Sequence, residues 1–412
     1  MKKVLIVDER FPYTGGTRTE KMVKYLPNFG WKPVILTIHQ TNRNPFADDI
    51  LKNYENHPLK IYTTKTFPTF SFLNHFNLAR LGTILNRLFY IPDTNLAWIP
   101  NALIKAFEIF KRENPHVIYS TSPNEGVHLV GYLLKLKFKK PWIADFRDLW
   151  TLCYGRYGPL TSFHHAINFW LEKSIYRKWS DLIIANTEEN KRIIIDHFHV
   201  DPNKIEVITN GFDPDEILQS EPQVKSKNLI LGYFGAFIKP MTCHKEFLYG
   251  MEKALESEKR IDLKLWTLLT ESQKKELMRN PVLRNHVSFQ GYFSHQQSIR
   301  ELAKTDILLV ILKSTFPYVA PQKLYNYMAL KKPILAIAPP DGCAARVIRE
   351  TKTGTIVSPD NPDEIADKLL SLFKIWEEGG LKYNPDMAAL NKYRSDNLTK
   401  DLSLAFSRFH QP

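Results

Sequence analysis

The chain has 412 residues, of which 43% are hydrophobic and 24% are charged, a composition typical of a folded protein with two domains. Its three cysteines are far apart and form no Cys/His cluster, which argues against a disulfide framework or a zinc site and fits a reducing cytoplasm. The net charge is +13, and residues 1–212 carry 28 basic against 19 acidic side chains. This excess indicates an acidic partner, such as membrane lipid, lipid phosphate or nucleic acid, or else a merely soluble basic surface.

The first apolar run, residues 4–7, precedes Asp8 and is too short for a signal peptide. No run approaches the roughly 18 apolar residues of a membrane span. We therefore expect a protein that is not integral to a membrane.

Short apolar runs alternate with helical stretches through the first 212 residues. The expected strands cover residues 4–7, 34–37, 117–120, 142–145, 182–185 and 205–208. This alternation predicts a parallel, doubly wound sheet, in which ligands bind beyond the carboxyl ends of the strands. Gly15 and Gly16 follow the first strand, where they would let a ligand approach the backbone or form an ordinary tight turn. Arg147 and Asp148 follow another strand, where Asp148 could orient or deprotonate a hydroxyl, or the two could form a structural ion pair.

Residues 60–112 have a different character. Phe, Leu and Ile are frequent, bases recur, and Asp93 is the only acid between Glu55 and Glu108. The bases that flank the apolar stripe are Lys60, Lys65, Arg80, Arg87 and Lys105. Such a basic amphipathic segment can lie in a membrane interface, and it can equally be a buried helix of the domain.

Residues 214–227 are polar and contain two prolines, which is typical of a linker. The strand pattern restarts after them. Residues 229–235 are expected to form a strand and then a glycine turn at Gly235, and further strands are expected over residues 261–266, 287–289, 307–310, 334–337 and 354–357. The sequence therefore predicts a second Rossmann-like half, and each half has about 200 residues.

The stretch from residue 318 to residue 337 runs from a loop through a helix into a buried strand. Pro321 suits the first position of this helix, because that position needs no N–H. Lys323 lies in the first turn, where it adds a full charge to the partial positive charge of the helix start. The stretch predicts an anion site or, alternatively, an ordinary core helix with a surface lysine.

Six motifs in this order resemble those of the family 4 retaining glycosyltransferases, and they extend over nearly the whole chain. They are the segments at residues 11–16, 144–150, 207–213, 232–235, 291–295 and 321–327. The resemblance is strongest to bacterial members that build cell-surface polysaccharide. It implies the GT-B fold, an α/β architecture of two facing Rossmann-like doubly wound parallel-sheet domains with a cleft between them.

The resemblance also implies domain boundaries and partners. It implies an acceptor-binding domain over residues 1–212, a linker over 213–227, a nucleotide-sugar domain over 228–390 and a C-terminal helix in 391–412 that packs back on the first domain. The expected reaction moves a sugar from a nucleotide-diphosphate donor to a hydroxyl of a glycan or lipid-linked acceptor. No metal or other cofactor and no nucleic acid partner are expected. The expected location is the cytoplasm, with peripheral contact to an anionic membrane as a further possibility.

Carried over residue by residue, the resemblance assigns donor binding to Gly15, Gly16, Gly235, Lys239, Phe293, Lys323 and Asn326. Lys323 is expected to take part in catalysis by meeting the pyrophosphate, and Asp148 and Arg147 are expected to do so because they follow a strand, where Asp148 could orient or deprotonate the acceptor. Tyr318 and Asn326 stand where the family carries two glutamates. This departure favours, as an alternative, a degenerate GT-B protein that acts as a scaffold, and a sugar-nucleotide epimerase is the third hypothesis.

Overall fold

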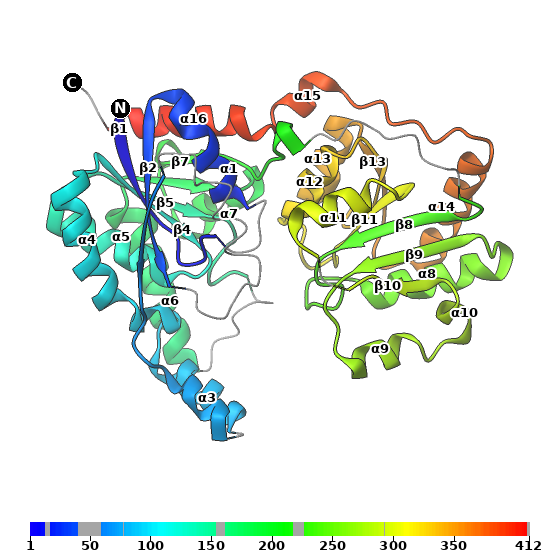
Figure 1. Cartoon of the computed structure of the whole chain (residues 1–412), viewed down its shortest axis with the longest axis horizontal. Coiled ribbons are helices and arrows are strands. Elements are labelled where there is room, and N and C mark those ends of the chain that lie inside the picture. Colours follow the sequence, from blue (N-terminus) through cyan, green and yellow to red (C-terminus); the bar gives the residue numbers. More distant parts are fainter. Residues whose placement is uncertain are drawn as a thin grey trace. The chain divides into compact units, whose positions relative to one another are not determined.

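The computed structural model describes residues 1–12, 17–39, 59–76, 78–153, 161–216, 226–291 and 293–409. The chain forms two compact units, one of residues 1–209 with 398–412 and the other of residues 210–397. Each unit is a parallel β-sheet with helices on both faces (Figure 1). The prediction of two doubly wound Rossmann-like domains is therefore confirmed.

The sheet of the first unit has the strand order β3-β2-β1-β4-β5-β6-β7, and every neighbouring pair is parallel. Its strands are β1 (Lys2–Val7), β2 (Trp31–Ile38), β3 (Lys60–Thr64), β4 (Val117–Ser122), β5 (Trp142–Phe146), β6 (Leu182–Ala185) and β7 (Ile205–Val207). The central strands are almost continuously apolar and are buried on both faces, as parallel strands covered by helices must be.

Apart from α3, the helices of the first unit bury apolar side chains in the body of the unit. The helices are α1 (Arg18–Tyr25), α3 (Ala79–Phe89), α4 (Ile99–Glu113), α5 (Gly126–Phe138), α6 (Ser162–Ser174), α7 (Glu188–Phe198) and the last helix, α16 (Ser395–Ser407). One cluster joins Met22 of α1, Trp31 of β2 and Phe406 of α16, and the Trp31 and Phe406 rings meet edge to face at 5.3 Å. Residues 398–409 are thus held in the first unit by burial of their apolar side chains, although they are the last part of the described chain.

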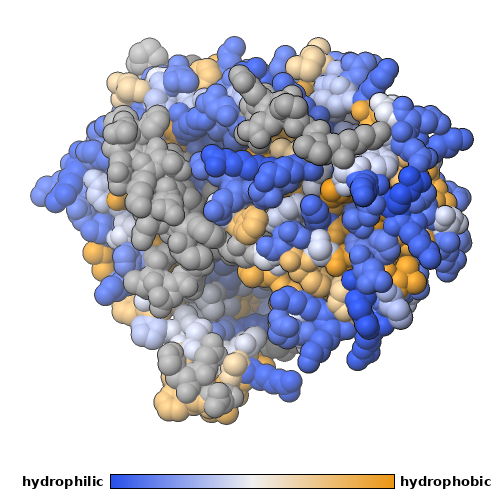
Figure 2. Space-filling view, turned by 45° about the vertical axis from the view of Figure 1, so that its right-hand side comes forward, coloured by the Kyte–Doolittle hydropathy of each residue, from blue (hydrophilic) through white to orange (hydrophobic). Residues whose placement is uncertain are grey.

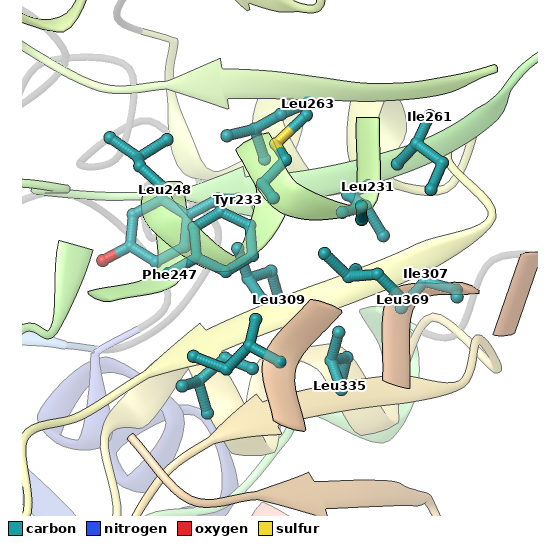
Figure 3. Packing of buried hydrophobic residues seen from close by; sticks show 14 of the residues in the cluster. Leu231, Tyr233, Phe247, Leu248, Ile261, Leu263, Ile307, Leu309, Leu335 and Leu369 are labelled. Carbon is teal, nitrogen blue, oxygen red and sulfur yellow. The ribbon is translucent and has the colours of Figure 1, made fainter. Parts of the chain in front are cut away.

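The sheet of the second unit has the order β10-β9-β8-β11-β12-β13 and is also parallel. Its strands are β8 (Leu229–Phe234), β9 (Ile261–Trp266), β10 (Val287–Phe289), β11 (Ile307–Ile311), β12 (Ile334–Ile337) and β13 (Gly354–Val357). Successive residues of β11 alternate between two apolar clusters: Leu309 packs in one and Leu308 in the other. Figure 3 shows the first of these clusters, in which Leu309 and Leu231 of the sheet lie near Phe247 of helix α8.

The helices of the second unit cover both faces of its sheet. They are α8 (His244–Ser257), α9 (Glu271–Leu277), α10 (Pro281–Arg284), α11 (His295–Leu302), α12 (Gln322–Met328), α13 (Cys343–Thr351), α14 (Pro362–Glu377) and α15 (Met387–Asn391). Helices α8 and α14 approach closely at Gly250, where an added Cβ would come within 2.6 Å of the Ile365 side chain. A glycine is required there by packing, since any larger side chain would push the two helices apart.

Helix α12 begins one residue later than the sequence suggested. Pro321 has an extended conformation, with φ −69° and ψ 148°, so it is the residue that caps the helix rather than its first residue. Its missing N–H is equally harmless in that position, which explains why the sequence pattern did not distinguish the two.

Two interpretations were open for residues 60–112, and the structure divides them: α4 buries one apolar face, whereas α3 is exposed and is not a buried helix. Gly82 is the one residue of α3 that is buried. It lies against the backbone carbonyl of Phe70 in the preceding 3-10 helix, η2 (Phe70–Phe76). Figure 1 shows α3 at the lower tip of the first unit. Among the described residues, no helix combines the length and apolar character that crossing a membrane requires.

Candidate functional site

The strand order of the second unit reverses between β8 and β11, and this is where a doubly wound sheet binds its ligand. Gly235 directly follows β8, and Lys313 follows β11. Lys323 lies in the first turn of α12, the helix that comes next in the chain after β11. Gly235 and Lys323, which the resemblance singled out, thus lie at this switch point together with Lys313.

The Lys323 ammonium group lies in a confined position beside the turn after β8. Its Nζ is 3.6 Å from the centre of the Tyr233 ring, which is close enough for a cation–π interaction. A Cβ added to Gly235 would lie 3.4 Å from this Nζ, so the glycine, with φ +99°, leaves one side of the amine open. No carboxylate of the described residues forms an ion pair with Lys323. Burial, and then the charge of Lys239, hold the pKa of Lys323 well below its ordinary value.

The backbone turn that carries Lys239 is fixed by Thr242. The Thr242 hydroxyl donates to the Phe237 carbonyl at 2.8 Å and accepts from the Lys239 amide at 3.1 Å. Helix α8 begins directly after this turn with His244, whose pKa is lowered by burial and also by Lys313. Basic groups from three segments therefore lie near this turn. The first turn of α8 also carries Glu246, which raises the pKa of His244, whereas the charge that acts on Lys323 is that of Lys239. Such an arrangement can hold a polyanion such as a diphosphate.

The other two donor-binding candidates of this unit have partners of their own. Phe293 is partly buried and packs against the apolar cluster that contains Trp266 and Leu324. Asn326 is buried, and its Oδ1 accepts a hydrogen bond of 2.9 Å from Gln322. Gln322 also donates to the Gly211 carbonyl at 2.8 Å, so the Asn326 side chain belongs to a network that ties α12 to the start of the unit. Among the described residues, no group of three or more His, Cys, Asp or Glu side chains is placed to hold a metal ion.

In the first unit the strand order reverses between β1 and β4, and a polar cluster occupies this switch point. Asn124 donates to Glu9 Oε1 at 2.7 Å and accepts from Arg10 Nη2 at 2.8 Å. Arg10 also forms an ion pair with Glu9, at 3.1 Å between Nε and Oε1. Glu9 is buried, and burial raises its pKa although Arg10 lowers it. The cluster offers a carboxylate and a guanidinium at the edge where this type of sheet binds ligands.

Arg147 and Asp148 follow β5, as the sequence suggested. The Arg147 Nε donates to the backbone carbonyl of Ser122, and its own carbonyl accepts from Asn186 Nδ2 at 3.0 Å. Arg147 therefore braces the ends of neighbouring strands, and Asp148 lies beside it, partly exposed. Gly15 and Gly16 lie outside the described residues.

A buried ion pair between Arg18 and Asp145 stabilises the strands that end at this edge of the sheet. The Arg18 Nη2 lies 3.1 Å from Asp145 Oδ1, and both side chains are almost fully buried. Asp145 Oδ2 accepts from the Tyr119 hydroxyl at 2.6 Å and from Thr121 at 2.7 Å. This network joins α1 to the last residues of β4 and β5, from which the polar cluster and Arg147 follow.

Glu172 of α6 fixes the backbone that follows Asp148. Its carboxylate accepts hydrogen bonds from the amides of Trp150 and Thr151, from the Thr151 hydroxyl and from the Tyr176 hydroxyl. Burial raises the pKa of Glu172 from 4.5 to about 7, because desolvation of the charge outweighs these hydrogen bonds. The folded protein therefore holds this proton more tightly than the unfolded chain.

This difference gives a testable pH dependence. The Glu172 contribution to stability is present in full below about pH 4.5, and it is lost as the pH rises toward about 7. We expect Glu172→Gln, which does not titrate, to remove this loss, so that the free energy of unfolding falls less between these pH values than in the wild type. Urea denaturation at a series of pH values measures the difference. Parallel pH profiles for the two proteins would contradict the assignment.

The sequence did not reveal those site residues whose contacts join segments that are far apart in the chain. Lys313 could have been found, because it follows a buried strand just as Arg147 does. Glu9 and Arg10 also follow a strand and could have been selected by the same rule, but nothing in the sequence connects them to Asn124. The Tyr233 ring under Lys323 follows only from the fold, since tyrosine in a buried strand is most often a core residue.

Comparison with known proteins places these features in a family. The family model described as Glycosyltransferase Family 4 matches residues 16–216, and the one described as Glycosyl transferases group 1 matches residues 269–382. An uncharacterized glycosyltransferase of Methanocaldococcus jannaschii is 26% identical over 126 residues. That match covers 29% of this chain and 30% of the relative, so this chain spans about a third of the relative's length.

Similar solved structures cover almost the whole chain. A glycosyltransferase from Rickettsia africae is 18% identical with a TM-score of 0.69, and the match covers 99% of this chain and 98% of the other. HepE of Anabaena, solved in complex with UDP and glucose, is 16% identical with a TM-score of 0.69 and coverages of 99% and 100%. The UDP-GlcNAc 2-epimerase of Neisseria meningitidis, bound to UDP-GlcNAc, is 15% identical with a TM-score of 0.59 and coverages of 98% and 100%. At these identities the likeness shows the fold alone.

Two doubly wound parallel sheets that match such structures from end to end define a protein of the GT-B class. The two family models, one matching each half of the chain, show which group of GT-B proteins this chain belongs to. The chain belongs to glycosyltransferase family 4.

Proposed function

We propose that this glycosyltransferase moves a sugar from a nucleoside-diphosphate donor to a hydroxyl group of a glycan or lipid-linked acceptor, with retention of the anomeric configuration and without a divalent metal ion. The observation that carries the proposal is the partly buried Lys323, which lies beside the open face of Gly235 at the switch point of the second unit. The Anabaena structure with UDP and glucose supports a nucleotide-sugar donor, because it shares the fold.

Lys323 suits the departing diphosphate for an electrostatic reason. When the bond between the anomeric carbon and the diphosphate oxygen breaks, negative charge develops on that oxygen. A preorganised cation stabilises this charge more strongly in a partly desolvated position than it would in water. Lys239 adds positive potential beside Lys323, from the turn that precedes α8. These groups together could replace the metal ion that other enzymes use for diphosphates.

The acceptor is assigned to the first unit. We propose that Asp148 and Arg147, which directly follow β5, position or deprotonate the acceptor hydroxyl. Glu9 is a second candidate for this role, because its buried carboxyl has a raised pKa at the switch point and so holds a proton more readily than an exposed one. The protein is proposed to work in the cytoplasm.

The test is a panel of nucleoside diphosphates and their sugars, read by thermal shift. A ligand at about 100 times its Kd stabilises the folded state by about 2.7 kcal/mol, which raises the melting temperature by several degrees in a protein of this size. We expect one base of the panel to give such a shift in the presence of EDTA. The absence of any shift across the panel would overturn the proposal.

The same panel separates the other hypotheses. A transferase or hydrolysing enzyme releases nucleoside diphosphate from its sugar donor, whereas an epimerase converts one nucleotide sugar into another without an acceptor. A scaffold protein would do neither. Because a UDP-GlcNAc 2-epimerase has a similar fold, the fold does not separate the two classes of enzyme, and the reaction products must be identified to tell them apart.

A further inference from the structure

The edge of the first sheet carries a hollow that lies apart from both switch points. Its volume is about 560 Å³, which is within the range of about 300–1,000 Å³ of small-ligand sites. Strand β7 and the residues before it, Lys191 of α7, and the second half of α16 with Arg408 line this hollow, and all of them belong to the first unit. We call it the β7 hollow. Strand β7 is three strands away from β4, a distance of about 14 Å, so the hollow is separate from the cluster of Glu9 and Arg10.

Strand β7 has one open edge at the hollow. Its other edge pairs with β6, where the Ile208 amide donates to the Ala185 carbonyl at 3.1 Å. Because successive peptide groups of a strand point to opposite sides within the sheet, the N–H and C=O of Val207 point away from β6. In the part of the chain that the structure describes, no further strand pairs with β7. Val207 therefore presents one donor and one acceptor to the hollow.

Four ionisable side chains line the hollow, two acidic and two basic. Glu206, whose side chain is 20% exposed, forms an ion pair with Arg408, whose side chain is 56% exposed. Burial raises the pKa of Glu206, and Arg408 lowers it. Asp401 acts to raise the same pKa and Lys191 to lower it, so both side chains lie near the Glu206 carboxyl. With all four groups ionised, the lining carries no net charge.

One wall of the hollow is apolar and rests on the core. Leu404 is 58% exposed, and Ala405 is buried beside it on α16. Ile208, which directly follows β7, packs in the same cluster as Leu402 and Phe406 of α16, so the strand and the helix are held together. Figure 2 shows hydrophilic side chains over most of one face of the molecule, and polarity alone therefore marks no site. The β7 hollow differs because it combines paired charges, backbone groups and an apolar wall in a preformed shape.

We propose that the β7 hollow binds a neutral oligosaccharide. A hydroxyl group both donates and accepts hydrogen bonds, so a chain of sugars can satisfy the carboxylates, the cations and the Val207 backbone together. A lining without net charge gives no advantage to a polyanion or a polycation. An apolar ligand would desolvate the ionised groups without pairing them, which costs free energy.

The strand edge is too short to favour a peptide instead. An extended peptide that adds to a sheet needs a row of outward N–H and C=O groups. Strand β7 has three residues, and Ile205 already donates its N–H to the Pro202 carbonyl. The inference goes beyond the proposed sugar transfer and does not depend on it, since binding is measured without a nucleotide-sugar donor.

The experiment titrates the full chain with tetrasaccharides and measures binding by saturation-transfer NMR. The neutral probes are maltotetraose, cellotetraose and tetra-N-acetylchitotetraose, and the charged probes are tetragalacturonate and the tetramer of glucosamine. We expect at least one neutral probe to bind with a Kd of about 1 mM or below. The charged probes should bind more weakly than this neutral one, because the lining has no net charge to offset their desolvation.

Three substitutions in the hollow test where the probe binds. Leu404→Trp should weaken binding of the neutral probe by at least about ten-fold, because the larger side chain fills the hollow. Asp401→Ala and Arg408→Ala each remove a charged hydrogen-bonding partner and should weaken it by about ten-fold. The last two variants leave opposite net charges. At low salt, Asp401→Ala should therefore improve binding of tetragalacturonate, and Arg408→Ala should improve binding of the glucosamine tetramer.

The controls separate this site from other effects. Arg112→Ala and Asp196→Ala remove exposed charges of the same unit outside the hollow and should leave the Kd within about two-fold of the wild type. Lys323→Met, which alters the proposed donor site, should also bind the neutral probe normally, so failure of one proposal is distinguished from failure of the other.

The substituted residues of the hollow are exposed, so melting temperatures close to that of the wild type are expected. Absence of binding by all three neutral probes would overturn the proposal, as would unchanged binding by Leu404→Trp or tighter binding of a charged probe by the wild type. A concentration-dependent dimer that Leu404→Trp loses would also overturn it, because a second copy of the chain would then occupy the hollow.

Discussion

Replacing Lys323 by methionine is expected to abolish the thermal shift caused by the nucleoside diphosphate and to lower kcat/KM by about 10²- to 10³-fold. The magnitude is that of removing one preorganised group that stabilises developing charge, about 3–4 kcal/mol of transition-state stabilisation. Methionine has a similar length and no charge, so the change removes the cation and keeps most of the packing on Tyr233.

Lys323→Met should weaken nucleotide binding without lowering the stability of the free protein, so loss of binding can be distinguished from unfolding. Burial and Lys239 lower the pKa of Lys323, so the folded state of the free protein disfavours its charged form. Lys323→Met removes that cost, and we expect a melting temperature equal to or above that of the wild type in the absence of ligand. A variant that loses ligand binding because it is unfolded would show a lower melting temperature instead.

The control for this experiment is Lys275→Met, which removes one exposed cation from α9 of the same unit. We expect it to leave both the nucleotide-induced shift and kcat/KM within about two-fold of the wild type, because a surface charge contributes little. If Lys323→Met retained the full shift, or if both variants lost it equally, Lys323 would not be the diphosphate-binding group.

Ligand binding should also take up protons at Lys323. A diphosphate placed beside the ammonium raises its pKa back toward the ordinary value, since an opposite charge favours the charged form. The amine with its lowered pKa is therefore protonated more completely in the complex than in the free protein. This coupling explains how one lysine can be tolerated without a carboxylate partner among the described residues and still bind an anion.

The sequence predicted the fold well because its signals are local. Parallel strands that are covered on both faces appear as short apolar runs, and the runs at 117–120, 182–185 and 334–337 all lie within strands of the structure. Polar residues that follow such runs are found at the ligand-binding edge by the rule for doubly wound sheets, which is how Arg147 could be selected, whereas Gly235 was selected by the resemblance.

The rest could not be predicted because it depends on partners that are distant in the sequence. An amphipathic pattern around α3 shows that one face is apolar, but it cannot show whether that face meets the protein, and the fold leaves it open. Likewise, the charge of Lys60 was visible in the sequence, whereas its partner Glu113 was not. Hydrogen bonds from Lys60, Lys3 and Tyr62 outweigh the effect of burial and lower the pKa of Glu113 to about 2.

The same limit hid the ion pair of Arg18 with Asp145, whose disruption should have the largest effect on stability. Asp145→Asn keeps the shape of the side chain but leaves the buried Arg18 guanidinium without its counter-charge. Breaking a buried pair in this way costs about 3–5 kcal/mol, because the desolvated charge is no longer compensated. For a unit of this size the melting temperature should fall by about 10 °C.

A double-mutant cycle with Arg18→Met tests the origin of this loss. Arg18→Met alone leaves the Asp145 carboxylate buried, with the Tyr119 and Thr121 hydroxyls as its donors among the described residues, so it should also be strongly destabilising. The combination Arg18→Met/Asp145→Asn removes both charges and should be less destabilised than the sum of the two single variants, since no unpaired charge remains. Additive losses would show instead that the two side chains act through packing alone. Glu108→Gln, which removes the charge that pairs with both Lys105 and Arg112 on α4, should cost less than about 1 kcal/mol and provides the matched surface control.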